Sequence, residues 1–254
     1  MYLPWPSGGL PSRGRLPGAW LGGERGDIQV RPAAGGESPP TSPSHSPVTH
    51  THSAQLRAAA AVRAAAFYSY PADRSAFTVA SHQRVRLDTE WQALEAKTAG
   101  RDEAWKHVRV SCLVGTAPVS DHFSRGLDPS CKLPAEDDSS SPRVVLATLD
   151  VNIGHSLPAE ELCGQHTAQC AYLSNVCSAP GARRLGAARS LLDFAVAYVR
   201  ARGVRHLYVH VAEDNRSAAA LYVAAGFDVE CEETSAQAHL LSRPRRQLLR
   251  RTVQ

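Results

Sequence analysis

The 254-residue sequence predicts an α/β fold built on a mixed sheet. From residue 171 to residue 231, apolar residues alternate between strand-like runs and helical spacing, in the order strand, helix, strand, helix, strand. That order implies parallel neighbouring strands joined by helical crossovers. The composition, 43% hydrophobic and 20% charged, is typical of a globular protein. The length suits one α/β domain with appendages.

The amino-terminal residues differ from the rest of the chain. Residues 1–26 are rich in Gly, Pro and Ser and carry few aliphatic side chains, so they predict either a disordered tail or an organelle transit peptide. Residues 28–33 resemble a short strand ended by Pro32. The folded domain is therefore expected over 27–254, with residues 34–53 and 119–142 as flexible insertions.

The first half of the domain is expected to hold two helices followed by strands. Alanine-rich helical spacing begins at Leu56 and should end before Pro71, which disfavours continuation. A second helix is predicted to open at Asp88 and to stop at Gly100. Alternating or continuous apolar runs then predict strands at 108–114, 143–153 and 171–177.

The second half is more regular. Apolar residues at helical spacing predict a helix over 184–202, and Gly203 follows where a left-handed cap is needed. A strand is expected at 206–211, a helix at 215–225 and a strand at 227–231. The arginine-rich residues 246–253 predict a terminal edge strand rather than a nucleic-acid surface, because Leu248, Leu249 and Val253 lie among the arginines.

The turn between the strand at 171–177 and the next helix predicts a pyrophosphate site. Free backbone N–H groups at a helix amino terminus attract anions, and the helix dipole adds to that attraction. Arg183 and Arg184 supply positive charge, and the small residues 186–188 allow close approach. The segment lacks the glycine and lysine spacing of a dinucleotide fingerprint or a P-loop.

Two motifs resemble the GNAT superfamily of N-acetyltransferases. Arg183-x-x-Gly186-x-Ala188 is similar to the R/Q-x-x-G-x-G/A signature, with Ala188 where many members have glycine. About one strand and one helix later, the run from Asn215 to Phe227 resembles the second half of the family's cofactor site. A softer similarity to plant and algal plastid GNAT proteins covers roughly residues 54–254.

The resemblance implies a GNAT fold: a mixed, mostly antiparallel sheet, flanked by helices, whose central parallel strands splay apart to bind acetyl-CoA. It also implies the residues that hold this co-substrate. The backbone of the strand at 171–177 would pair with the pantetheine arm, and the turn after it would bind the pyrophosphate. Two residues of the second motif would contact acetyl-CoA as well. These residues are Val176, Cys177, Ser178, Arg183, Arg184, Leu185, Gly186, Ala187, Ala188, Asn215 and Tyr222.

Three side chains are candidates for the chemistry. Tyr222 falls within the second motif, where the resemblance implies a general acid; a half-buried aromatic is the alternative. Tyr208 and His210 share one face of a strand that should be apolar on both faces. The resemblance implies that His210 is a base assisted by Tyr172, as in several eukaryotic N-terminal acetyltransferases. A core histidine bonded to a carbonyl group is an equal alternative.

The implied activity is direct transfer of acetyl from acetyl-CoA to a protein amine, at N-termini, at lysines or at both. Acetylation of a small amine and a non-catalytic acyl-CoA-binding module are the alternatives. No metal is expected, because Cys163, His166 and Cys170 lack an evident fourth ligand. A net charge of +4 does not suggest nucleic acid, and no apolar run reaches membrane-span length. The resemblance implies the plastid stroma, with the cytoplasm as the alternative.

Overall fold

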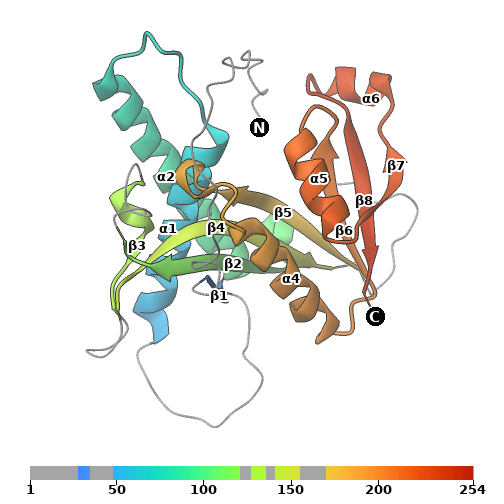
Figure 1. Ribbon diagram of the computed structural model, residues 1–254, viewed down its shortest axis with the longest axis horizontal. Helices are drawn as coiled ribbons and strands as arrows, with labels where there is room; N and C mark the ends of the chain where they lie inside the picture. Colours follow the sequence, from blue (N-terminus) through green and yellow to red (C-terminus); the bar gives the residue numbers. More distant parts are fainter. Residues whose placement is uncertain (1–27, 35–47, 121–126, 136–140, 155–169, 254) are drawn as a thin grey trace, which may run out of the picture.

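The computed structural model describes residues 28–34, 48–120, 127–135, 141–154 and 170–253 (Figure 1). This part of the chain forms an eight-stranded sheet in the order β1-β2-β4-β5-β6-β8-β7, with β3 beside β4. Every neighbouring pair is antiparallel except β5 and β6. The predicted α/β class with one central parallel pair is confirmed. The strands are β1 (Gln29–Ala34), β2 (Arg109–Pro118), β3 (Lys132–Leu133), β4 (Arg143–Ile153), β5 (Cys170–Ser178), β6 (His206–Ala212), β7 (Asp228–Glu232) and β8 (Arg246–Thr252).

Helices cover both faces of the sheet. Arg63 on α1 reaches Cys112, whereas Tyr198 on α4 bonds to Ser111, the preceding residue of β2. Because successive strand residues point to opposite faces, α1 and α4 lie on opposite sides of the sheet. The helices are α1 (Val48–Phe67), α2 (Ala76–Thr98), α4 (Ala187–Arg200), α5 (Arg216–Ala224) and α6 (Ser235–Leu240), with short 3-10 turns η2 (Glu103–Trp105), η3 (Pro129–Cys131) and η4 (Pro180–Ala182).

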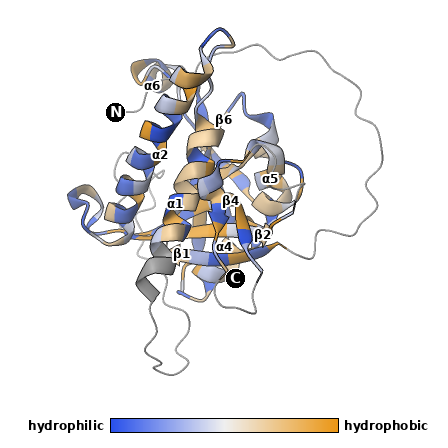
Figure 2. Ribbon diagram, turned by 90° about the vertical axis from the view of Figure 1, so that its left-hand side faces the viewer, coloured by the Kyte–Doolittle hydropathy of each residue, from blue (hydrophilic) through white to orange (hydrophobic). Residues whose placement is uncertain are grey.

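The main core lies between the sheet and these helices. Residues 110–117 of β2 and 144–152 of β4 are buried without interruption, as expected for central strands covered on both faces. The alanines at positions 58–61 of α1 are also buried, and their small side chains let the helix backbone approach the sheet closely. Figure 2 shows hydrophobic residues concentrated along these strands, while the outer surface of α2 is largely hydrophilic.

Several expected boundaries are wrong. Helix α2 begins at Ala76 rather than Asp88, because the Ser75 hydroxyl accepts a hydrogen bond from the backbone N–H of Thr78 and caps the helix there. Pro32 lies inside β1 instead of ending it, which an edge strand permits. The last strand, β8, is not an edge strand, since β7 pairs with its outer side.

The expected insertions are partly ordered. Helix α1 begins at Val48, inside the expected insertion 34–53, and η3 and β3 lie inside the expected insertion 119–142. Residues 1–26 lie outside the described part of the chain. Helix α6 was not expected from the sequence, although its capping box of Thr234 and Gln237 is a recognisable start signal. None of the described helices combines the length and apolarity that a membrane crossing needs.

Candidate active site

The central feature of the site is a gap between the two parallel strands. Strands β5 and β6 pair only from Cys170 with His206 to Leu173 with Val209. Beyond this seam β5 continues to Ser178 along β4, and β6 continues to Ala212 along β8. Among the described residues, the backbone of 174–178 therefore has no strand partner on its β6 side. A strand-like ligand could add to this edge by main-chain hydrogen bonds.

A β-bulge lies where the seam ends. On β4, one residue separates Thr148 from Asp150. Two residues separate their β5 partners, Cys177 and Ser174. The first of the two separating residues, Asn175, has a left-handed backbone with φ of 55°. A bulge bends its strand and re-aims its backbone groups. The bulge thus coincides with the point at which β5 leaves β6.

The predicted phosphate-binding turn follows β5. The chain adopts left-handed conformations at Arg184 (φ 70°) and Gly186 (φ 89°) before α4 begins. The backbone N–H groups of residues 184–188 have no hydrogen-bond acceptor among the described residues. A Cβ at Gly186 would meet no atom within 4 Å, and both Arg183 and Arg184 are exposed. Open donors beside two cationic side chains fit a pyrophosphate group.

Asn215 begins helix α5. Its side-chain oxygen accepts a hydrogen bond of 3.2 Å from the backbone N–H of Ala218, so it is the N-cap of the helix. The sequence assigned Asn215 to the cofactor, and the capping role was missed. Since one lone pair of the oxygen serves the helix, the amide nitrogen and the second lone pair are left to contact a ligand.

Tyr222 lies in α5 and is 5% exposed. Its ring packs against Phe227, and its hydroxyl has no hydrogen-bond partner among the described residues. Burial, followed by the nearby Cys177 sulfur, raises the pKa of Tyr222 well above its ordinary value. The phenol is therefore protonated at any working pH and can donate a hydrogen bond.

Cys177 lies in β5, close enough to affect Tyr222 electrostatically. Burial raises the pKa of the Cys177 thiol to about 12. A thiol that stays protonated is a poor nucleophile. The Cys177 sulfur is therefore not a candidate nucleophile.

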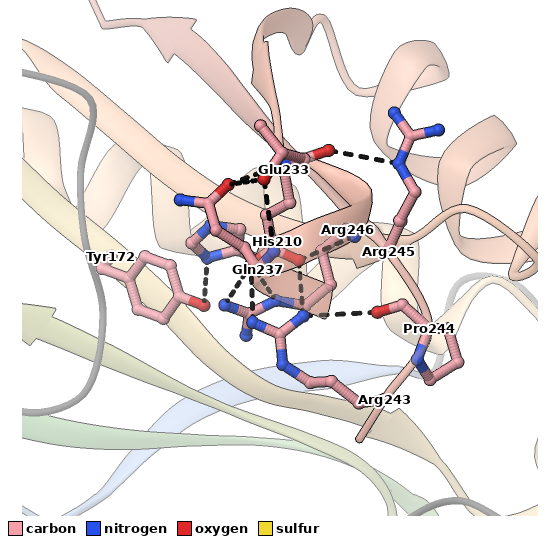
Figure 3. A network of polar contacts seen from close by, with 9 residues as sticks. Tyr172, His210, Glu233, Gln237, Arg243, Pro244, Arg245 and Arg246 are labelled. Carbon is pink, nitrogen blue, oxygen red and sulfur yellow. Dashed lines mark hydrogen bonds and ion pairs between the residues drawn. The ribbon is translucent and has the colours of Figure 1, made fainter. Parts of the chain in front are cut away.

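Tyr172 and His210 meet across the parallel seam (Figure 3). The Tyr172 hydroxyl oxygen lies 3.1 Å from His210 Nδ1, and the ring centroids are 5.7 Å apart. Tyr172 pairs with Tyr208 in the parallel register, so Tyr172 and His210 share one face of the sheet. The structure therefore brings together the two side chains that the sequence proposed as a pair.

A second polar cluster beside His210 was missed by the sequence reasoning. Glu233 accepts hydrogen bonds from Arg243 (2.6 Å) and from Arg246 (2.9 and 3.0 Å). Arg246 pairs with Ala212 in β8, so its side chain shares the face that carries His210 (Figure 3). Burial would raise the pKa of Glu233, but the bonds from Arg243 and Arg246 outweigh it and lower the pKa to about 2. The signal was the arginine run 243–246, which was attributed to a solvated strand.

Two other features lie away from the gap. A cavity of about 590 Å³ is lined by the end of α2 and by Ile153 and Gly154, at the opposite end of the seam. It lies at a helix carboxyl terminus, where the dipole disfavours a phosphate. Cys163 and His166 are outside the described residues. Within the described ranges, no three His, Cys, Asp or Glu side chains are grouped for a metal ion.

Comparison with known proteins defines the class to which this fold and site belong. The profile of the Acetyltransferase (GNAT) family matches residues 116–227, a span that contains β5, β6, the turn before α4 and Tyr222.

Two plant relatives identify the family within this class. GCN5-related N-acetyltransferase 7, chloroplastic, from Arabidopsis thaliana is 35% identical over 201 residues, which cover 77% of this chain and 71% of the relative. The chain therefore belongs to the GCN5-related N-acetyltransferase family. GCN5-related N-acetyltransferase 6, chloroplastic, from the same plant is 28% identical over 59% of this chain and 51% of its own length. A solved acetyltransferase of the GNAT family from Desulfovibrio desulfuricans is 15% identical, with a TM-score of 0.49 over 89% of this chain and 99% of its own.

Proposed function

We propose that this protein transfers the acetyl group of acetyl-CoA to an amine of a protein, either an N-terminal α-amine or a lysine ε-amine. The observation that carries the proposal is the Tyr172–His210 pair, which lies on the sheet at the closed end of a gap that a strand-like ligand can enter. A proton acceptor beside such a gap suits an acceptor amine that must lose a proton to react.

The residues around the gap fit acetyl-CoA. The pantetheine arm is an extended chain of amides, which matches the free edge of residues 174–178. The pyrophosphate suits the free N–H groups of residues 184–188, with Arg183 and Arg184 beside them. Asn215 can contribute through its amide nitrogen while its oxygen caps α5.

His210 accepts the proton of the incoming ammonium. A neutral imidazole nitrogen is the commonest proton acceptor in enzyme active sites. The Tyr172 hydroxyl lies within hydrogen-bonding distance of His210 Nδ1 and so fixes the orientation of the imidazole.

Bound acetyl-CoA supplies the thioester that the amine attacks. Tyr222 donates a hydrogen bond to the departing sulfur. Complete transfer of its proton is uphill, because its pKa is raised while an ordinary thiol has a pKa of about 8.5. The hydroxyl therefore acts mainly by stabilising developing negative charge in a water-poor setting. The nitrogen loses a second proton as the tetrahedral intermediate collapses, and that proton ends on the departing sulfur, so the products are the amide, the CoA thiol and protonated His210.

We assign the acceptor amine to the surface near the start of α2, which carries aromatic and polar side chains. The Tyr70 hydroxyl lies 2.9 Å from His82 Nδ1, Tyr68 is bonded to Glu90, and Phe77 is 82% exposed. Such a surface suits a peptide better than a buried small amine. We also place the protein in the plastid stroma, because both Arabidopsis relatives are named chloroplastic.

The test is acetyl transfer with three kinds of acceptor: peptides with a free α-amine and no lysine, Nα-blocked peptides with one lysine, and small amines including polyamines. Products are identified by mass spectrometry, and His210→Ala serves as the control for enzymatic turnover. Acetylated peptides support the proposal and show which amine is preferred. Products on small amines alone would refute the protein acceptor, and acetyl-CoA binding without any product would refute catalysis.

A further inference from the structure

A buried ion pair lies beneath the bulge. Arg63 of α1 donates from Nη2 to Asp150 Oδ1 of β4 at 2.6 Å, and each side chain is 2% exposed. The same nitrogen lies 3.3 Å from the Thr148 hydroxyl and 3.6 Å from the Cys112 sulfur. Burial opposes the charge of Arg63, but Asp150 outweighs it and the pKa of the guanidinium is raised. The guanidinium of Arg63 is therefore charged.

The second oxygen of Asp150 contacts the bulge. Asp150 Oδ2 accepts a hydrogen bond of 2.8 Å from the Asn175 side-chain nitrogen. Asn175 is the left-handed residue of β5, and the parallel seam with β6 ends two residues before it, at Leu173. One carboxylate thus links helix α1 to the residue at which β5 and β6 separate.

Stability alone does not account for a charged pair at this place. Removing two ions from water costs several kcal/mol each. A protein in which apolar residues of similar volume replace such a pair is often as stable. A buried pair is better suited to selecting one local conformation. A left-handed residue other than glycine is also unfavourable, although asparagine tolerates it better than most residues. The Asp150 bond can hold Asn175 in that conformation.

We infer that Asp150 is a positioning residue for the acetyl-CoA site. Fixed by Arg63, it holds the Asn175 bulge, and the bulge keeps the free edge of residues 174–178 in the arrangement that binds the pantetheine arm. Arg63 and Asp150 touch no ligand and act through the β5 backbone. This inference rests on the proposed use of acetyl-CoA.

A double-mutant cycle tests it, with the dissociation constant of acetyl-CoA measured by calorimetry. Asn175→Gly keeps the left-handed backbone accessible and removes the bond to Asp150. It should weaken binding about tenfold, the effect of one lost charge-assisted hydrogen bond. Asp150→Asn should weaken binding at least as much. Because the two residues act in series, the double variant should bind no more weakly than Asp150→Asn alone.

Two controls separate positioning from general damage. Ser242→Gly makes the same kind of change at another left-handed residue (φ 48°), in the turn before β8, and should bind normally. Leu94→Ala removes a buried α2 side chain and should lower the melting temperature without changing affinity. For Asn175→Gly, the KM for acetyl-CoA should rise while the KM for the acceptor peptide stays constant.

The binding measurements distinguish failure of this inference from failure of the proposed function. Wild-type affinity in Asn175→Gly overturns the inference, even where Asp150→Asn does not fold. Additive losses in the double variant overturn it too, because they make the two residues independent. A wild-type protein that binds no acetyl-CoA overturns the proposed function and this inference together, whereas normal wild-type binding with unaffected variants overturns this inference alone.

Discussion

The sheet consists of two unequal halves that meet at a seam of only four residue pairs. The first half, β1-β2-β4-β5, is covered by α1, α2 and α4, and its buried carboxylate, Asp150, is sealed from water. The second half, β6-β8-β7, carries α5 and α6, and its carboxylate, Glu233, keeps 14% exposure and is held by two arginines.

In the proposed function, this difference separates binding from chemistry. The first half would offer mainly backbone groups to acetyl-CoA, from the bulge to the turn before α4. The second half would offer the side chains His210 and Tyr222, with Tyr172 reaching across the seam. Damage to the first half should therefore abolish binding, and damage to the second should spare binding and slow turnover.

Gly186→Glu is the severest test of the first half. Bulk and negative charge at the free N–H groups should weaken acetyl-CoA binding by about a hundredfold or more, because phosphate and carboxylate repel each other at close range. Calorimetry measures the loss. Gly203→Glu is the matched control, since Gly203 is also left-handed with open space and lies at the other end of α4. Equal binding in both variants would remove the turn from the site.

Tyr222→Phe tests the second half. It should lower kcat by about a hundredfold and leave the dissociation constant of acetyl-CoA within about twofold, because the hydroxyl acts on the leaving sulfur only as the bond breaks. Steady-state kinetics and calorimetry separate the two quantities. Tyr198→Phe removes another buried tyrosine hydroxyl, bonded to Ser111, and should keep full turnover. Parallel loss of binding and turnover would contradict the acid role.

His210→Ala should reduce kcat by about ten- to a hundredfold. The dissociation constant of acetyl-CoA should stay within about twofold, because the imidazole acts on the acceptor amine and not on the co-substrate. Kinetic assays combined with calorimetry measure both effects. His206→Ala, at the opposite end of β6, should leave turnover unchanged. Full turnover in His210→Ala would argue against the base.

Glu233→Gln should affect stability more than chemistry. The lowered pKa of Glu233 means that its charged form stabilises the fold above about pH 4.5, and that this contribution is lost as pH falls towards about 2. The variant should lose roughly 2 kcal/mol at pH 7, and this loss should disappear in acid. Urea unfolding at several pH values measures it. Glu232→Gln, at a 52% exposed partner of Arg245, should change stability little.

The sequence was most informative where structure is local. The turn motif around Gly186, the cap at Gly203 and the apolar spacing of α4 depend on neighbouring residues, and these predictions agree with the structure. The Tyr172–His210 contact was expected only from resemblance, since periodicity cannot place residues 38 positions apart. The role of Asn215 was read incompletely, because a helix cap and a ligand contact favour the same residue type.

The sequence could not predict the hydrogen bonds and ion pairs between residues that lie far apart along the chain. The partners Arg63, Asp150 and Asn175 lie on three elements, and nothing in their spacing indicates that they meet. The same holds for Glu233 and its arginines, which a solvated strand would also explain. The start of α2 was misplaced because the ability of Ser75 to cap a helix was not considered.

Pro32 makes the outer edge of the sheet less able to pair with a strand of another molecule. An exposed strand edge invites pairing with strands of other molecules, which leads to aggregation. In β1 the proline lacks a backbone N–H, and the register with β2 shifts immediately after it. At the opposite edge, β7 has five residues and presents Asp228, Glu230 and Glu232 at alternate positions. Neither outer edge offers the long, regular row of donors that a strand from another chain would need.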